Sequence, residues 1–261
     1  MIEAMDRDTP FDWGEHTLDE GSEFCLGLGP LTLRFARRSG EIRIAHHHED
    51  PATEGEEPEW TRWAPMPDWS GVIRLRPAFP DRLVVVKPDQ DFWLMKGARA
   101  RVYLRVPMHV VIEAVGPRTR ALLRVPTMTL TDTWWGTSEE GELGYGLDTR
   151  GRRELRDDVF EEHLGICPLH LENPSDDDLH VDRIALRVVH LSLFRDGNRL
   201  WSDTTRVRYL GEDAGSRIDM SGNAPEETAG AELLAGPEDP RARGFSARTF
   251  ARLRSSIEGL L

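Results

Sequence analysis

One stretch of the chain, residues 163–210, decides the fold class: HLGICPLHLENPSDDDLHVDRIALRVVHLSLFRDGNRLWSDTTRVRYL. Between residues 184 and 188 the apolar side chains occupy every second position, which is the period of a half-buried strand and not of a helix. The polar run 173–178 contains a proline and predicts a corner, and Asp196-Gly197 between apolar pairs predicts a tight hairpin. The stretch therefore predicts a run of antiparallel strands.

The same alternation recurs towards the N-terminus, in residues 31–35, 72–76 and 101–106. The chain has 261 residues, of which 39% are hydrophobic, so it is long enough to bury a sizeable core. We expect a mostly β protein made of antiparallel β-sandwich-like halves with a C-terminal helix.

The expected division of the chain follows changes in composition. We place an N-terminal β region at 24–135 and a C-terminal β region at 136–210, because the segment after residue 135 is rich in glycine and charge. Residues 211–245 hold few large apolar side chains and predict a linker or surface loop. Residues 246–261 predict a helix capped by Ser246, with apolar residues at helical spacing: Phe250, Leu253, Ile257 and Leu260.

Charge and cysteine content exclude several classes of protein. The net charge of −13 disfavours nucleic-acid binding, because neutralising phosphates requires clustered cations, and it disfavours docking on an anionic membrane. The acidic N-terminus does not resemble a signal peptide, and no run approaches the roughly 20 apolar residues of a membrane helix. The two cysteines, far apart in sequence, predict buried thiols. We expect a cytoplasmic protein without direct membrane insertion.

The run 46–50, His-His-His-Glu-Asp, is the cluster with metal-ligand chemistry. On a strand, His46 and His48 share one face, and two imidazoles at this spacing can bind Zn²⁺ together with a third ligand, which is a carboxylate such as Glu49 or Asp50 or a distant histidine. A catalytic site would leave one coordination position open for water. The opposing interpretation is a solvated strand end, and it is favoured because no HExxH motif follows and the other histidines are scattered.

Trp134 and Trp135, with Tyr145 nearby in sequence, can form an aromatic platform for a sugar or a cationic ligand. The alternative is one indole facing the core and one at the rim of a sheet. No Gly-x-Ser-x-Gly elbow and no phosphate-binding glycine loop is present in the sequence. We therefore expect no cofactor and assign no catalytic residue.

Three segments resemble the DUF432 family of archaeal and bacterial proteins: residues 73–77, 84–88 and 102–111, the last reading VYLRVPMHVV. The layout of strands between residues 169 and 210 is also similar, so the resemblance covers about residues 25–210. The family is one of unknown function, so the resemblance implies no catalytic residue. Some relatives occur beside mechanosensitive-channel-type membrane domains, which would imply an accessory role that needs a membrane partner.

The leading hypothesis from the sequence is a non-catalytic binding module with a protein partner. The first alternative is a metal-dependent, hydrolase-like enzyme that uses His46 and His48. The second alternative is an accessory module of a channel-type partner. The oligomeric state does not follow from these patterns.

Overall fold

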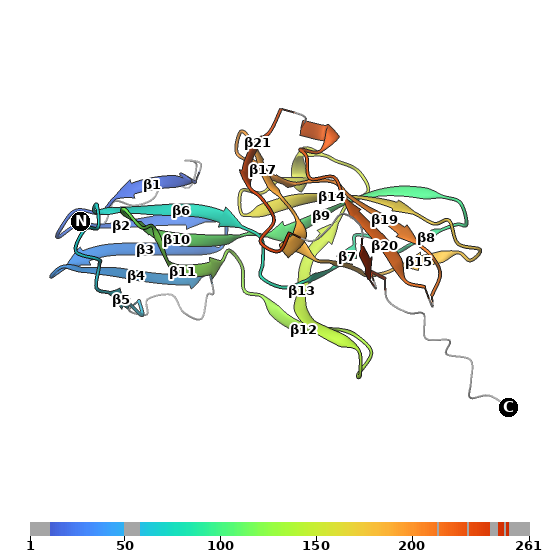
Figure 1. The fold of residues 1–261 in the computed structure, drawn as a ribbon, viewed down its shortest axis with the longest axis horizontal. Helices are drawn as coiled ribbons and strands as arrows, with labels where there is room; N and C mark the ends of the chain where they lie inside the picture. Colours follow the sequence, from blue (N-terminus) through green and yellow to red (C-terminus); the bar gives the residue numbers. More distant parts are fainter. Residues whose placement is uncertain are drawn as a thin grey trace. The chain divides into compact units, whose positions relative to one another are not determined.

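The computed structural model describes residues 11–49, 58–212, 214–228, 230–240, 245–247 and 249–250, and its strands are shown in Figure 1. The chain divides into two compact units. Unit 1 consists of Met1–Phe79, Pro107–Thr129 and Glu161–Leu164, and unit 2 consists of Pro80–Val106, Leu130–Phe160 and Gly165–Leu261. Strands dominate both units. The described helical segments are single 3₁₀ turns: η2 (Asp157–Val159), η3 (Val188–His190) and η4 (Glu226–Thr228). The prediction of a mostly β protein is confirmed.

Unit 1 contains two four-stranded sheets in which all neighbouring strands are antiparallel. The first has the order β1-β6-β10-β11, and the second has the order β2-β3-β4-β5. Their bounds are β1 Gly14–Thr17, β2 Glu23–Leu28, β3 Leu31–Arg38, β4 Glu41–His48, β5 Thr61–Trp63, β6 Val72–Ala78, β10 His109–Val115 and β11 Arg120–Pro126.

The core of unit 1 is shared by its two sheets. Along β3, Leu31, Leu33 and Phe35 are fully buried while the residues between them are partly exposed, because successive side chains of a strand point to opposite faces. These side chains belong to one hydrophobic cluster with Ile73 of β6 and Ile112 of β10. The alternating pattern in the sequence therefore places one apolar face of each sheet in a common core.

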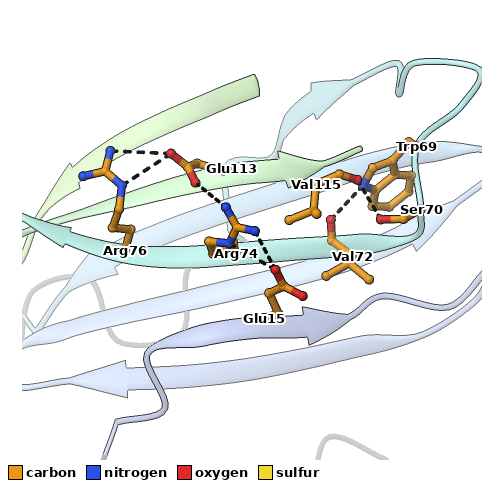
Figure 2. A network of polar contacts seen from close by, with 8 residues as sticks. All are labelled: Glu15, Trp69, Ser70, Val72, Arg74, Arg76, Glu113 and Val115. Carbon is orange, nitrogen blue, oxygen red and sulfur yellow. Dashed lines mark hydrogen bonds and ion pairs between the residues drawn. The ribbon is translucent and has the colours of Figure 1, made fainter. Parts of the chain in front are cut away.

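A ladder of ion pairs crosses the first sheet of unit 1 and holds its edge strand β1 (Figure 2). Arg74 lies opposite both Glu15 and Glu113 in the register; its guanidinium is 2.6 Å from Glu15 and 3.7 Å from Glu113. Arg76 also contacts Glu113, at 3.4 Å. Most of these groups are exposed to water, so each ion pair alone contributes little to the free energy of folding. Together the pairs place opposite charges side by side on three adjacent strands.

The loop before β6 is fastened to the same sheet by two side chains (Figure 2). The Trp69 indole donates its Nε1–H to the carbonyl oxygen of Val72 at 2.8 Å, and Ser70 donates its hydroxyl to the carbonyl oxygen of Val115 at 2.6 Å. These bonds satisfy backbone acceptors at the strand ends. The irregular segment before β6 is therefore packed where the structure describes it.

Unit 2 contains a four-stranded sheet of order β12-β13-β7-β16, a ribbon of β8 and β15, and a larger sheet of order β21-β17-β18-β14-β19-β20-β22 in which β9 also pairs with β14. The bounds are β7 Val84–Pro88, β8 Phe92–Leu94, β9 Arg99–Pro107, β12 Thr131–Gly136, β13 Gly141–Gly151, β14 Leu164–Glu172, β15 Leu179–Val181, β16 Ile184–Leu186, β17 Leu193–Asp196, β18 Arg199–Ser202, β19 Thr205–Tyr209, β20 Ser216–Met220, β21 Glu232–Ala235 and β22 Phe245–Ala247.

The stretch 163–210 forms strands as predicted, but its pairing is mixed. The hairpin at Asp196-Gly197 is confirmed: Asp196 pairs with Arg199, and Gly197 adopts a left-handed φ of 58°. In contrast, β14 pairs in parallel with both β18 and β19, which corrects the expectation of purely antiparallel strands. The alternation of apolar and polar residues along a strand shows which face of that strand is buried. It does not show whether the neighbouring strand runs parallel or antiparallel.

The expected C-terminal helix is not present in the described residues. Ser246, the predicted cap, lies in β22, which pairs with β20, and Phe250 forms a bridge to Ile184. Residues 251–261 lie outside the described residues. In addition, β20 and β21 fall in the range 211–245 that we expected to be a linker, and residue 135, the expected boundary, lies inside β12. Short strands held by backbone bonds leave little trace in composition, because pairing does not require large apolar side chains.

Among the described residues, no helix is long and apolar enough to cross a membrane.

A buried carboxylate joins three segments of unit 2. Asp203 is 1% exposed and accepts hydrogen bonds from the backbone N–H groups of Ser192 (2.8 Å) and Gly222 (2.9 Å). Burial raises the pKa of Asp203 above its ordinary value, and the two N–H donors oppose this shift. Burial likewise raises the pKa of the Cys167 thiol, to about 12.

The raised pKa of Asp203 predicts a pH-dependent contribution to stability. Because the folded state favours the protonated carboxyl, this contribution is present below the unfolded-state pKa of 3.8 and is lost as the pH rises through the higher folded-state pKa. The test is the free energy of unfolding in urea, measured for wild type and for Asp203→Asn. The difference, wild type minus Asp203→Asn, should be larger at about pH 3.5 than at about pH 7. The exposed Asp148→Asn serves as the control for an ordinary surface charge. A difference that is constant between the two pH values, or larger at neutral pH, would contradict the prediction.

Candidate functional site

The β12–β13 hairpin presents the two predicted tryptophans on opposite faces. In the register, Asp132 pairs with Tyr145 and Trp134 pairs with Leu143, and directly paired residues share a face of the ribbon. Trp135 is one residue further along and therefore points to the other side. Figure 1 shows this hairpin extending beyond the other strands of its sheet.

The inner face of the hairpin packs on the rest of unit 2. Trp135 is 6% exposed and clusters with Leu83, Val85 and Ala185. Gly144 of β13 lies so close to Leu83 that an added Cβ would be 2.6 Å from its side chain, so a glycine is required for this packing. The hairpin is thereby anchored, and Trp135 supports the outer face without being part of it.

The outer face carries an indole that is exposed and yet held in place. Trp134 is 54% exposed, and its Nε1–H donates to the carbonyl oxygen of Thr137 at 2.8 Å. The ring lies across Gly141, where any side chain would fall well inside van der Waals contact with it. The turn beneath is closed by Thr137, whose backbone N–H and hydroxyl bond to Glu140. Two independent contacts therefore fix the ring while leaving much of it open to solvent.

Apolar and charged side chains surround Trp134 on this face. Leu143 is 44% exposed and lies directly opposite it. At the base of the hairpin, Tyr145 donates its hydroxyl to Asp81 at 2.9 Å, and the Arg82 guanidinium lies over the Tyr145 ring, 5.2 Å from its centroid. Arg82 also pairs with Asp132 at 3.2 Å. Burial, followed by the Asp81 carboxylate, raises the pKa of Tyr145, so its phenol remains a hydrogen-bond donor.

The structure adds three residues that the sequence hypothesis did not include, namely Leu143, Arg82 and Asp132. Leu143 and Asp132 could have been found from the register of the β12–β13 hairpin. The sequence does not give this register, because it does not show which residue of β13 lies opposite Trp134. Arg82 comes from another segment and left no signal near the tryptophans. Together these residues form an apolar centre with an ion pair at its edge, which suits binding more than proton transfer.

The second candidate site is the histidine run at the end of β4. His46 and His48 lie on one face as predicted, with ring centroids 6.4 Å apart, and His47 points to the other side. The His48 Nε2–H donates to the carbonyl oxygen of Pro126 at 2.8 Å, which leaves Nδ1 of that ring as its available lone pair. Burial, and then the neighbouring His48, lower the pKa of His46, so the neutral, ligand-competent imidazole is favoured.

A third ligand for these histidines is not in place within the described part of the chain. There, no group of three or more His, Cys, Asp or Glu side chains is arranged to hold a metal ion. Asp50, one of the carboxylates expected to complete the site, lies outside the described residues. The metal site at His46 and His48 therefore stays a prediction.

The fixed position of Trp134 can be tested by hydrogen exchange. The change Gly141→Ala should displace the ring from its place over β13 and break the bond to Thr137, because a methyl group cannot share this space with the indole. Exchange of the Trp134 Nε1 proton, followed by NMR on ¹⁵N-labelled protein, should become markedly faster. Gly146→Ala on the same strand is the matched control, since its added Cβ would meet Thr133 at an ordinary 3.6 Å. Unchanged exchange in Gly141→Ala would contradict the described contact.

Comparison with known proteins places the chain in a family. No curated protein and no solved structure matches it. The family described as "Protein of unknown function (DUF432)" has a sequence model that matches residues 12–254, which is nearly the whole chain. This match confirms the resemblance found in residues 73–111 and extends it towards both termini. The chain therefore belongs to the DUF432 family.

Proposed function

We propose that this chain is a non-catalytic binding module, built from β-sandwich-like halves, whose β12–β13 hairpin binds a protein partner. The observation that carries the proposal is the Trp134 side chain, which is 54% exposed and nevertheless fixed by Thr137 and Gly141. Holding a large apolar ring in water gives no benefit to folding, whereas it prepares the ring for a contact.

The energetics of binding support this role. A partner that binds a mobile side chain must immobilise it, at a cost of about 0.5–1.5 kcal/mol for each such group. Here the ring is already ordered in the free protein. Residues that dominate protein interfaces are often tryptophans at the centre of an apolar patch with a polar rim, and Trp134, Leu143 and the Arg82–Asp132 pair have this arrangement.

The geometry favours a protein over the other ligands that an aromatic platform suits. The Trp134 Nε1–H already donates to Thr137, so it is not available to a sugar hydroxyl. The Tyr145 ring is already covered by the Arg82 guanidinium, so that ring has a cation in place. What remains accessible is the apolar surface of Trp134 and Leu143, which an apolar side chain of another protein would cover.

The test is affinity capture from a lysate of the source organism, with quantitative mass spectrometry, using wild type, Trp134→Ala and Trp93→Ala. Trp93 is the matched control, because it is also highly exposed (59%) but lies on the β8–β15 ribbon. We expect at least one protein to be retained by wild type and by Trp93→Ala, and to be reduced about tenfold or more by Trp134→Ala, since interface tryptophans typically contribute about 2 kcal/mol or more.

The proposal fails if no captured protein depends on Trp134, or if Trp93→Ala reduces the same proteins to the same extent. Equal thermal unfolding of the three proteins shows that the comparison concerns binding and not folding.

A metal-dependent, hydrolase-like enzyme is the second candidate, and one contact favours it. The hydrogen bond from His48 to the Pro126 carbonyl is the kind that orients a metal-binding imidazole through its non-ligating nitrogen. His46 would supply the second nitrogen, and the third ligand is the one that the sequence predicts, a carboxylate or a distant histidine.

Metal content decides this candidate. Tag-free protein expressed with zinc, iron and manganese should contain close to one equivalent of metal, and His46→Ala/His48→Ala should contain none. Absence of metal from wild type would remove the site. An accessory role beside a channel-type membrane partner stays a prediction of the family resemblance alone.

A further inference from the structure

A hollow of about 670 Å³ in unit 2 is lined by alternating charges. It lies at the end of β7 and β13, beside the start of β8 and the end of β15. Its lining residues are Lys87, Pro88, Asp89, Gln90, Asp91, Arg150, Asp182 and Arg183. This volume is within the range of about 300–1,000 Å³ that is usual for small-molecule sites.

An irregularity in the sheet brings two cations to this hollow. Strand β13 runs parallel to β7, and their pairing advances from Leu147↔Val86 to Gly151↔Pro88. Three residues of β13, 148–150, thus lie opposite the single residue Lys87 of β7, so β13 contains a bulge there. Arg150 belongs to this bulge, and it and Lys87 line the same hollow from neighbouring strands.

The acids of the hollow already have polar partners, two of which are guanidinium groups. Asp89 pairs with Arg152 at 2.6 Å, Asp91 contacts the His180 imidazole at 2.8 Å, and Asp182 lies 3.5 Å from Arg183. Lys87 and Arg150, in contrast, form no ion pair with any residue in the described part of the chain, although both are exposed. With Asp89 matched by Arg152 and Asp182 by Arg183, Lys87 and Arg150 remain beside the Asp91 carboxylate, which leaves a surplus of one positive charge.

This surplus stands out because the chain as a whole carries a net charge of −13. With so many carboxylates present, exposed arginines of unit 2 such as Arg101, Arg199 and Arg217 have acidic partners. Lys87 and Arg150 repel each other across the hollow, and the Asp91 carboxylate offsets only one of their two charges. Their placement is therefore better explained by a ligand than by the stability of the fold.

An adjoining hollow of about 340 Å³ continues the same surface. It shares Asp89 and Gln90 with the first and adds Arg153, whose guanidinium lies 4.4 Å from the centroid of the Phe92 ring. Stacking on Phe92 holds this third cation without neutralising it. Arg153 has no carboxylate partner among the described residues either.

From these observations we infer that the hollow at Lys87 and Arg150 binds a small oxyanion, which is a molecule that bears phosphate or carboxylate groups. The Arg150 guanidinium is suited to two hydrogen bonds with such a group, and the Lys87 ammonium adds a point charge. The strongly negative chain repels extended polyanions at longer range, so the site suits a small molecule and not a nucleic acid. This inference is independent of the β12–β13 hairpin.

The experiment is isothermal titration calorimetry of the tag-free full chain with two probes, sodium pyrophosphate and sodium citrate. Three proteins are compared: wild type, Lys87→Gln/Arg150→Gln, and the control Arg62→Gln/Arg118→Gln. The control residues are exposed, belong to unit 1 and have no ion-pair partner among the described residues. Both double variants remove two positive charges, so a general effect of net charge acts on them equally.

We expect one bound anion per wild-type chain. The affinity should fall about tenfold or more in Lys87→Gln/Arg150→Gln, which corresponds to about 1.4 kcal/mol, and should change less than about twofold in the control. The tighter of the two probes identifies the anion as phosphate-like or carboxylate-like. Absence of binding by both probes up to about 10 mM, or an equal loss in the control, would overturn the inference. Thermal unfolding confirms that both variants are folded, since the four substituted side chains are exposed.

Discussion

The pleat of the β-strand is the constraint on which the rest of this structure depends, because it sends successive side chains to opposite faces. In β3 the pleat places Leu31, Leu33 and Phe35 in the shared core of unit 1. In β12 the same geometry buries Trp135 and exposes Trp134. The core and the proposed binding surface are therefore two results of one rule, and a shift of register by one residue would exchange them.

Two glycines of β13 make the surface of the β12–β13 hairpin rigid. Gly144 lets β13 approach Leu83, which fixes the inner face of the hairpin, and Gly141 gives the Trp134 ring a place to lie on the outer face. The bond from Trp134 to Thr137 then adds direction. An exposed aromatic side chain held by such contacts loses little entropy when a partner covers it, which connects local packing to the proposed function.

Charge is organised in the same local manner. Across the first sheet of unit 1, Glu15, Arg74 and Glu113 alternate in charge over three adjacent strands. With Arg76 beside Glu113, two carboxylates and two guanidinium groups balance. Around the bulge of β13 the order breaks, and Lys87 and Arg150 remain without acidic partners in the described chain. A chain with 30% charged residues can pair most of its charges on its surface, and the presence of two unpaired cations in one hollow, more than the lack of a partner alone, is what indicates a ligand.

The sequence by itself determined the fold class, the hairpin at Asp196-Gly197 and the shared face of His46 and His48, since each depends on neighbours along one strand. It also determined the family, through the segments around residues 73–111. Tertiary structure decided the parallel pairing of β14, the strand at Ser246 in place of a helix, and the placement of Lys87 and Arg150 around one hollow. These features depend on contacts between distant segments, and such contacts follow from strand order and backbone pairing, which one-dimensional periodicity does not encode.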